Sequence, residues 1–385
     1  MGICFSKSST SPRHATYDRE ESTREPAAAD FENGVSALSV SLGTPPERLR
    51  WGVDGPLEQH QIQQAAYHMG AFVVGDKVTS PRRLAKAGQT VHDVRLLLKH
   101  GRGNVKADDN PSHGHNGIGS SVAMRGLTGE NKLARAVVMG AAVCDQTAPL
   151  CAIVHAPHMA ANERSTTYGG TFTLKQINDQ GAEIPVMADH TWSELWRESR
   201  SPTSTVVMDA WANGPAVRLK DSAWSQEPAT EGPWSMDKSY AEFLKKRVEG
   251  LIPDLHPLID DDVSRDLRIR RDAPMSWNKY AEAQVISPEF AKSVRKTLSR
   301  FPKEEKMEIA SRMIRETYGM DPNQKAVKSV LVAANRLDSL PRPPVSPSEY
   351  TTARGSNRPV PEPRGAGIDE DTAPRQRTRA RGGRV

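Results

Sequence analysis

The sequence has few cysteines and no long apolar segment. Its 385 residues include three cysteines, at positions 4, 144 and 151. A count that is sparse and odd argues against a disulfide framework and favours a reducing compartment as the place of action. No apolar run approaches the ~20 residues that a membrane-spanning helix needs, and no secretory signal segment is apparent. The composition therefore argues against a disulfide-stapled domain and against a protein built on membrane-spanning helices.

Both ends of the chain are poor in large apolar residues. Residues 6–45 are rich in Ser, Thr, Ala and Glu, and residues 341–385 are rich in Pro, Arg and Gly. Such segments bury too little apolar surface to offset the entropy lost on ordering, so we expect both to be disordered. We divide the chain into an N-terminal segment at 1–45, a catalytic domain with its N-terminal helices at 46–235, a helical region at 236–340 and a tail at 341–385.

The charge of the chain gives little information about its partners. The net charge of +5 is modest and lies partly in the Arg-rich tail. No aromatic residues are interleaved with these arginines to stack on bases, so we do not expect a nucleic-acid partner.

The first residues match a lipidation signal. Met1 is followed by Gly2, Cys4 and Ser6, which fits the pattern for N-myristoylation of Gly2, with Cys4 placed for palmitoylation. One myristoyl chain binds a bilayer only marginally, so stable anchoring needs a second signal, and Cys4 supplies it.

The middle of the chain predicts helices on both sides of a run of strands. Apolar residues recur at helical spacing in residues 57–69, 91–99 and 131–139, and again in 235–251, 288–301, 302–318 and 322–337. Residues 171–177 and 183–188 have strand character and flank a polar turn. Together with two further strands described next, they predict an antiparallel meander packed on a helix, and hence an α+β fold.

Three residues in the stretch 140–211 have the chemistry of a thiol catalytic triad, namely Cys144, His190 and Asp209. Residues 190–196 and 205–211 both predict strands, and the polar turn between them predicts a hairpin. If the hairpin closes symmetrically between Arg200 and Ser201, His190 and Asp209 become diagonal neighbours on one face, about 7–8 Å apart. We therefore expect the imidazole and the carboxylate to meet.

Two tryptophans of the same hairpin, Trp192 and Trp211, are expected to line the site. On the symmetric register Trp211 lies opposite His190, and Trp192 shares the face of His190. We expect these two side chains to contact substrate and to restrict the access of water.

The thiol predicted to be the nucleophile is that of Cys144. It precedes an apolar helix, and the dipole at the start of a helix favours a thiolate. Pro149 would lie too deep in a helix that begins at residue 145, so the start is either kinked or the regular helix begins near Thr147. Cys151 is the rival nucleophile, but its apolar surroundings are typical of a small buried side chain.

Two groups of residues have a loose resemblance to metal ligands. His113 and His115 lie between glycines in a loop, which is a chelating site, part of the mouth of the active site, or an ordinary surface loop. Cys151, His155 and His158 have metal-like spacing, but Pro157 interrupts any helix that would align them. We expect neither a metal nor a cofactor.

The combination of these residues resembles a known family. A cysteine before a helix, then His-x-Trp-x-Glu from His190, then Val-Val-x-Asp ending at Asp209, resembles the transglutaminase-like branch of the papain-like thiol enzymes. The match is closer to the HopX/AvrPphE/XopE family of type III secreted effectors. It covers about residues 46–340, and the Met-Gly-x-Cys-x-Ser start resembles the acylated XopE members.

The resemblance implies a function and a place of action. It implies a Cys-His-Asp triad at Cys144, His190 and Asp209, and an acyl-transfer enzyme that acts on host proteins in a plant cell and suppresses immunity. For lipidated members it implies the host plasma membrane, with a secretion chaperone as a further partner. Transglutamination, deamidation and proteolysis all stay open. The alternative is a non-enzymatic, membrane-tethered adaptor that recruits or sequesters host proteins.

Overall fold

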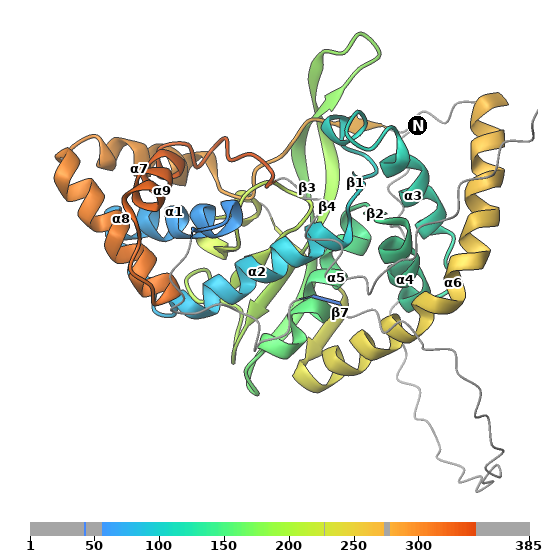
Figure 1. Cartoon of the computed structure of the whole chain (residues 1–385), viewed down its shortest axis with the longest axis horizontal. Coiled ribbons are helices and arrows are strands. Elements are labelled where there is room, and N and C mark those ends of the chain that lie inside the picture. The colour runs from blue at the N-terminus through green and yellow to red at the C-terminus, as the bar shows by residue number, and fades with distance from the viewer. Residues whose placement is uncertain (1–41, 44–55, 227, 273–277, 344–385) are drawn as a thin grey trace, which may run out of the picture.

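The described part of the chain is a mixed α+β structure. The computed structural model describes residues 42–43, 56–226, 228–272 and 278–343, so most of the two expected tails lies outside the described residues. Helices surround a small antiparallel sheet, as the sequence predicted at this level (Figure 1). No helix in the described ranges is both long and apolar enough to cross a bilayer.

The centre of the molecule is a long antiparallel hairpin formed by β3 (Arg164–Ile177) and β4 (Glu183–Trp196). Its turn is closed by the Asn178 side chain, which accepts hydrogen bonds from the amides of Gln180 and Ala182. The turn end of the hairpin projects from the body of the protein (Figure 1). Sequence analysis expected two strands in 183–196, and the structure joins them into one.

Four shorter strands extend this hairpin into the main sheet. Its order is β6-β5-β4-β3-β7, and β8 also pairs with β3. A separate two-stranded parallel sheet is formed by β1 and β2. Of the four added strands, only β5 was expected from the sequence. The bounds are β5 (Val206–Met208), β6 (Val217–Arg218), β7 (Thr230–Asp237), β8 (Lys279–Tyr280), β1 (Gly101–Arg102) and β2 (Ala141–Ala142).

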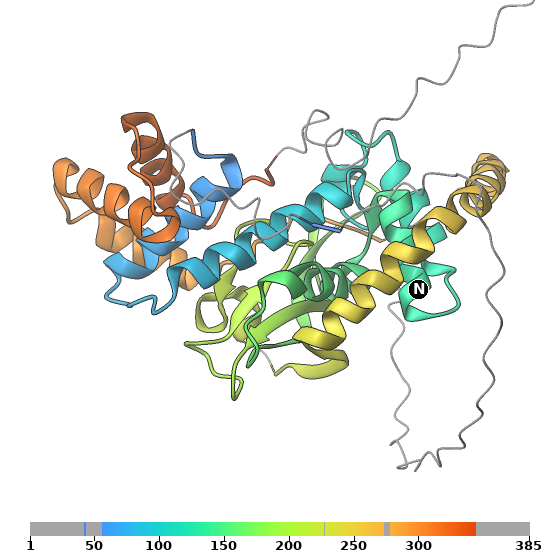
Figure 2. The ribbon, with the colours of Figure 1, turned by 60° about the horizontal axis from the view of Figure 1, so that its bottom comes forward.

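The helices lie in two groups on either side of the sheet (Figures 1 and 2). The first N-terminal helix, α1 (Gln59–Val73), packs against α7 (Pro288–Leu298), α8 (Lys303–Tyr318) and α9 (Gln324–Ala334). The other group contains α3 (His115–Met124), α4 (Gly129–Met139) and α6 (Lys238–Asp272). The division expected at residue 235 therefore separates elements that pack together.

Several helices begin or end at residue types that favour helix termini. The α7 helix begins after Ser287, whose hydroxyl accepts the amide of Phe290, and α4 and α8 end at Gly140 and Gly319, both left-handed. The helix expected to begin at residue 235 begins at Lys238. The preceding residues instead pair with β3 as the end of β7, since hydrogen bonding to a neighbouring strand outweighs local helical spacing.

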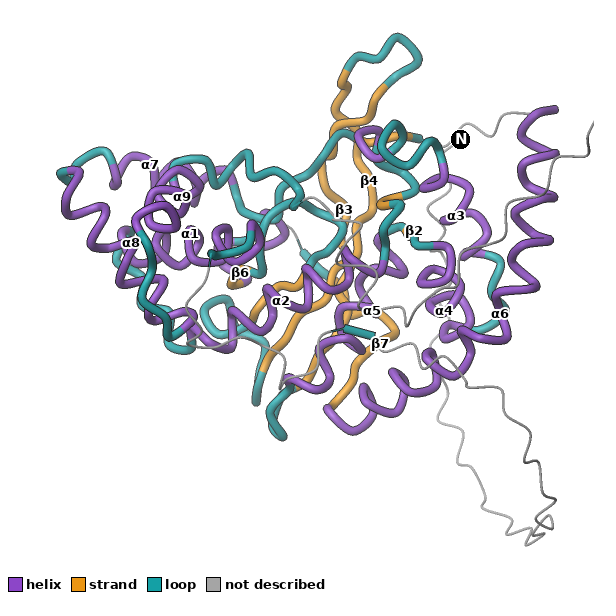
Figure 3. Tube along the Cα trace, in the orientation of Figure 1, coloured by secondary structure: helices purple, strands orange, loops and turns teal. Residues whose placement is uncertain are grey.

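The helix that carries Cys144 is the most enclosed one. In α5 (Cys144–His155) every residue except Asp145 is buried, and the helix packs against β3, β4 and α2 (Pro81–Leu97), as its place in the tube trace shows (Figure 3). A helix that is apolar all round belongs in a core. This packing fixes the position of Cys144 relative to the sheet.

Substitution of Gly140 and of Gly250 by alanine tests the backbone conformations assigned to these two glycines. Gly140 has φ +62°, and a Cβ there would lie 2.9 Å from Lys99 Cγ, so Gly140→Ala should lower the free energy of unfolding by about 1–2 kcal/mol. Gly250 lies within α6 with nothing near its Cβ position, so Gly250→Ala should raise it by about 0.5–1 kcal/mol. Urea unfolding of both variants measures the two effects, and equal effects would contradict the assigned backbone conformations.

Candidate active site

The thiol of Cys144 lies at the first residue of α5. The preceding residue, Val143, has the extended backbone of an N-cap, and its amide donates to Gln146 Oε1 at 3.0 Å. The Thr147 hydroxyl donates to the Val143 carbonyl at 2.8 Å. These side chains provide the hydrogen bonds that start the helix at Cys144. The expectation that regular helix begins near Thr147 is therefore wrong.

Pro149 is accommodated inside this helix. It is the sixth helical residue, so its missing N–H would have bonded the carbonyl of Asp145 in the first turn. Proline therefore costs one helical bond near the start of the helix, where the positive end of the helix dipole lies beside the thiol. Cys144 is 7% exposed, so its thiol lies at the edge of the core.

His190 and Asp209 meet as the hairpin predicted. Strands β4 and β5 pair Ser193 with Met208 and Leu195 with Val206, which is the register of a turn centred between Arg200 and Ser201. The strand pairing ends at Met208, and the backbone then turns so that Asp209 Oδ2 lies 2.7 Å from His190 Nε2. The expected contact between imidazole and carboxylate is confirmed.

The other nitrogen of His190 has a different environment. Nδ1 is buried and has no hydrogen-bond partner among the described residues. With Asp209 accepting from Nε2–H, the neutral imidazole carries its lone pair on Nδ1, an assignment that follows from the hydrogen-bond pattern. Nδ1 is therefore the atom that can take a proton.

Asp209 is fully buried and surrounded by donors. Its Oδ1 accepts the amides of Trp211 and Ala212, at 2.9 and 3.1 Å, and its Oδ2 accepts Trp224 Nε1 at 2.9 Å besides His190. Burial alone would raise the pKa of Asp209, but the contact with His190 and the two amides outweigh burial and hold it below the usual 3.8. The carboxylate is therefore ionised.

Three tryptophans enclose the imidazole of His190. The ring centroids of Trp224, Trp211 and Trp192 lie 4.4, 4.7 and 6.1 Å from that of His190. Trp192 and Trp211 are at most 1% exposed, and their N–H groups donate to Glu194 and Asn104. Neither lines the cavity, so the expected substrate contacts of these two residues are replaced by packing behind the histidine.

Trp224 was not found by sequence analysis. It lies in a short 3-10 turn (Ala223–Ser225), 15 residues after Asp209, with no strand pattern to place it on the face of His190. The chain brings it there through the loop that follows β6. Only its type, an aromatic ring with one donor that needs a partner when buried, was a signal.

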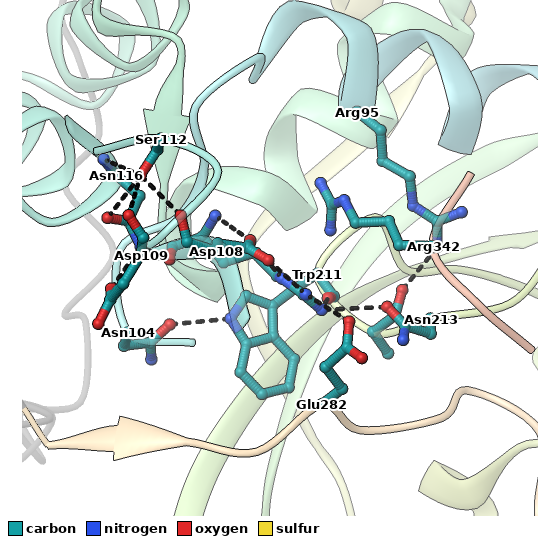
Figure 4. Close-up of polar contacts among 12 residues, drawn as sticks. Arg95, Asn104, Asp108, Asp109, Ser112, Asn116, Trp211, Asn213, Glu282 and Arg342 are labelled. Carbon is teal, nitrogen blue, oxygen red and sulfur yellow. Dashed lines mark hydrogen bonds and ion pairs between the residues drawn. The ribbon is translucent and has the colours of Figure 1, made fainter. Parts of the chain in front are cut away.

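Three arginines, of which Arg95 and Arg102 are buried, shape the loop after Asp209, which runs through residues 210–214 (Figure 4). Arg95 of α2 donates to the carbonyls of Ala212 and Gly214 at 2.6 and 2.8 Å. Arg102 of β1 donates to the carbonyl of Trp211 at 2.8 Å, and Arg342 to that of Ala210 at 3.1 Å. Three segments distant in sequence thus fix this loop, and none of them was predicted to take part.

A cavity of about 810 Å³ opens over Cys144 and His190, both of which line it. Its size falls within the range of ~300–1,000 Å³ that is usual for ligand sites. One side is formed by the first turn of α5 and by β3 and β4, where the Thr191 hydroxyl donates to Asp145 at 3.1 Å. The lining also contains apolar and aromatic residues, namely Met124, Leu133, Pro149, Trp234 and Tyr240.

Cys151 does not compete with Cys144 for this cavity. It is completely buried, and burial together with the negative charge of Asp209 raises its pKa to about 12. At neutral pH it is a protonated thiol, the less nucleophilic form. The structure therefore agrees with its reading as a buried apolar side chain.

Neither histidine group considered as a metal site forms a cluster of three ligands. His115 begins α3 and stacks on His100 at 5.1 Å, while His155 Nδ1 bonds the Thr90 hydroxyl. Within the described ranges, Glu58, His60 and His92 place their potential ligand atoms within 4.8 Å of one another. The rings of His60 and His92 are parallel and stacked at 3.9 Å, so their lone pairs cannot converge on one ion.

The lipidation sites Gly2 and Cys4 lie outside the described residues. Their predicted modification stays a prediction.

The ionised state of Asp209 has a pH signature. A carboxylate whose folded pKa is depressed contributes stability above its unfolded pKa of ~3.9, and loses it as the pH falls through the folded pKa. Asp209→Asn should lower the free energy of unfolding by roughly 2–4 kcal/mol at pH 7, and by progressively less below about pH 4. Urea unfolding between pH 3 and pH 7 measures the difference.

The matched control is Asp189→Asn, which changes an exposed aspartate at the same cavity. Its effect should stay within about 0.5 kcal/mol at every pH. An Asp209→Asn effect that does not change between pH 7 and pH 3 would contradict the ionised pair.

Comparison with known protein families, characterised proteins and solved structures finds no match. The chemistry of the site is therefore argued from the arrangement of Cys144, His190 and Asp209 and from the cavity over them.

Proposed function

We propose that the chain is a thiol acyl-transfer enzyme with Cys144 as nucleophile, His190 as base and Asp209 as orienting group. The observation that carries the proposal is the hydrogen bond from His190 Nε2 to Asp209, which leaves the buried Nδ1 as proton acceptor beside a cavity that Cys144 also lines. A thiol, a base and an oriented carboxylate are the parts that nucleophilic catalysis requires.

In the first half of the reaction, His190 Nδ1 takes the thiol proton of Cys144. The thiolate attacks the carbonyl carbon of a carboxamide or peptide, and a tetrahedral oxyanion forms. The C–N bond then breaks, and the leaving ammonia or amine takes the proton from the imidazolium. Asp209 stabilises the imidazolium through the 2.7 Å contact while keeping its own charge.

In the second half, the thioester on Cys144 is attacked by water or by an amine, whose proton passes to His190. The C–S bond then breaks, and the Cys144 thiolate takes the proton back from His190. Water gives deamidation or proteolysis, and an amine gives a crosslink. The cavity of about 810 Å³ is lined by Asp145, Asp189 and Glu231 as well as by Cys144. All three products remain within the proposal.

The oxyanion needs two donors, and we assign the second to Gln146. Its Oε1 accepts the Val143 amide, which fixes the orientation of the side-chain amide. Nε2 donates to the sulfur of Met124, a weak acceptor on a flexible side chain at the cavity. A substrate oxygen is a better acceptor, and the Cys144 amide supplies the other donor.

The biological setting is proposed from the sequence. We propose a transglutaminase-like core, supported by a cysteine helix packed on an antiparallel sheet and by the chain order of the three residues. With its lipidation signal at Gly2 and Cys4, the chain fits a type III effector that modifies host proteins at the plasma membrane and suppresses immunity. An adaptor without catalysis is the competing function.

The nucleophile is tested by alkylation. Iodoacetamide at pH 6 should modify Cys144 rapidly in the wild type, because an imidazolium and a helix start favour the thiolate at a pH where an ordinary thiol of pKa ~8.5 reacts slowly. His190→Ala should reduce that rate by about 10-fold. Peptide mapping by mass spectrometry separates Cys144 from Cys4 and Cys151, and Cys151→Ala is the control that should match the wild type.

The function itself is tested in plant lysate. Intact-mass and N-terminal analysis of host proteins after treatment with wild type or Cys144→Ala should show a change that depends on Cys144. If biological activity survives in Cys144→Ala and is lost in Gly2→Ala, the result contradicts the proposed enzyme and supports the non-enzymatic adaptor.

Gln146→Glu tests the second oxyanion donor without removing the helix start. The carboxylate can still accept the Val143 amide but cannot donate. Because Gln146 is 2% exposed, burying the new charge should lower stability, and urea unfolding measures that loss separately. Acylation by p-nitrophenyl acetate, which passes through an oxyanion, should fall by about 10-fold or more.

Alkylation by iodoacetamide at pH 9.5 serves as the control, because it forms no oxyanion and the thiol is ionised there. It should stay within about 3-fold of the wild type. An equal fall in both rates would assign Gln146 a structural role alone.

A further inference from the structure

A second, smaller pocket lies where α2 begins, against the turn that joins β4 and β5. Its volume is about 110 Å³, and no Asp or Glu is among its lining residues, all of which lie in the described ranges. Four of the lining residues carry hydroxyl groups and three carry guanidinium groups. They are Thr79, Ser80, Thr203, Ser204, Arg83, Arg197 and Arg218.

Two of these arginines have donors left over. The side chain of Arg197 is half exposed, and its recorded protein contact is through Nε, 3.2 Å from Glu163. Arg218 is 7% exposed, and its Nε and Nη2 are bonded to Tyr67, Asp76 and Asp221. Nη1 of Arg218 has no recorded acceptor among the described residues. Both guanidinium groups can therefore accept a further anion.

The third arginine builds the wall of the pocket. Arg83 binds Glu163 through Nε and the carbonyls of Ser204 and Leu195 through its terminal nitrogens, at 2.8 and 2.9 Å. Burial and the nearby charge of Arg197 lower the pKa of Arg83, against the opposing effect of Glu163. These contacts hold the turn after β4 against the start of α2.

The surrounding charges leave a positive excess. Three carboxylates pair with four cationic side chains around the pocket. The carboxylates are Glu163, Asp76 and Asp221, and the cations are Arg83, Arg197, Arg218 and Lys220. The start of α2, a helix of 17 residues, adds its dipole and its first-turn amides, and the N-cap residue Ser80 makes no side-chain capping bond. Proteins bind phosphate through hydrogen-bond donors of three kinds that occur here, namely the amides of a helix start, hydroxyl groups and guanidinium groups.

We propose that this pocket binds one phosphate group of a phosphate monoester, held by Arg197, Arg218 and the start of α2. Its volume is well below the ~300 Å³ at which sites for drug-sized ligands begin, so the pocket takes the phosphate and leaves the rest of the ligand outside. The ester is a small soluble phosphate or the phosphorylated headgroup of a lipid. The proposal is independent of the chemistry at Cys144.

The experiment measures binding of inorganic phosphate to the full chain by thermal shift and equilibrium dialysis, at constant ionic strength set with chloride. Phosphate should raise the unfolding midpoint of the wild type. Arg197→Gln, at a half-exposed side chain, should weaken phosphate binding by at least about 10-fold. Arg82→Gln removes the same charge at the neighbouring exposed position outside the pocket and should change binding by less than about 2-fold.

Ser80→Asp separates ligand binding from stability. Aspartate is a good N-cap, so this variant should unfold at a higher temperature without phosphate, yet its negative charge should abolish the shift that phosphate produces. A loss of binding together with a gain in stability cannot come from damage to the fold.

Two further arms identify the source of the phosphate. Inositol trisphosphate in solution is compared with phosphatidylcholine vesicles that contain 5% phosphatidylinositol bisphosphate, using chain without lipid at Gly2. Binding to vesicles that Arg197→Gln abolishes and Arg82→Gln spares assigns a lipid headgroup, whereas binding of the soluble ester alone assigns a free phosphate. No phosphate binding at 20 mM, or equal losses in Arg197→Gln and Arg82→Gln, would overturn the proposal.

Discussion

The charge on Asp209 is the constraint on which the rest of the site depends. A carboxylate taken out of water is costly unless donors replace its hydration, and here two backbone amides, an indole and an imidazole do so. The two amides belong to the turn directly after Asp209, so the charge also holds that turn closed. The orientation of His190 therefore follows from how the chain folds beyond β5.

Guanidinium groups from other parts of the chain bind the backbone carbonyls of that turn. Arg95 binds the carbonyls of residues 212 and 214, Arg102 binds that of Trp211 and is itself held by both oxygens of Asp108, and Arg342 binds Ala210. Arg95 lies on α2, Arg102 on β1, and Arg342 on the segment that follows α9. Parts of the chain far from residues 210–214 in sequence thus hold the loop that follows Asp209.

The sequence was informative where local geometry decides the outcome. Strand alternation and a centred turn were enough to bring His190 and Asp209 into contact, because side chains two residues apart share a face. The predictions from sequence were wrong or incomplete where a residue distant in the chain determines the local structure. Trp224 reaches Asp209 through an irregular loop, and Ser235 joins β7 because β3 offers it hydrogen bonds. The start of α5 at Cys144 depended on side-chain bonds from Gln146 and Thr147 that helical periodicity does not encode.

In the proposed reaction, Nδ1 of His190 accepts the proton, while Nε2 is bonded to Asp209. This choice of nitrogen affects how closely the fold controls the position of the base. Nδ1 is the ring nitrogen closer to the main chain, so rotation of the ring carries it through a shorter arc. Asp209 holds Nε2, and three indoles surround the ring, so these contacts restrict its rotation. In the proposed reaction, the position of strand β4 would therefore set the distance over which the proton moves.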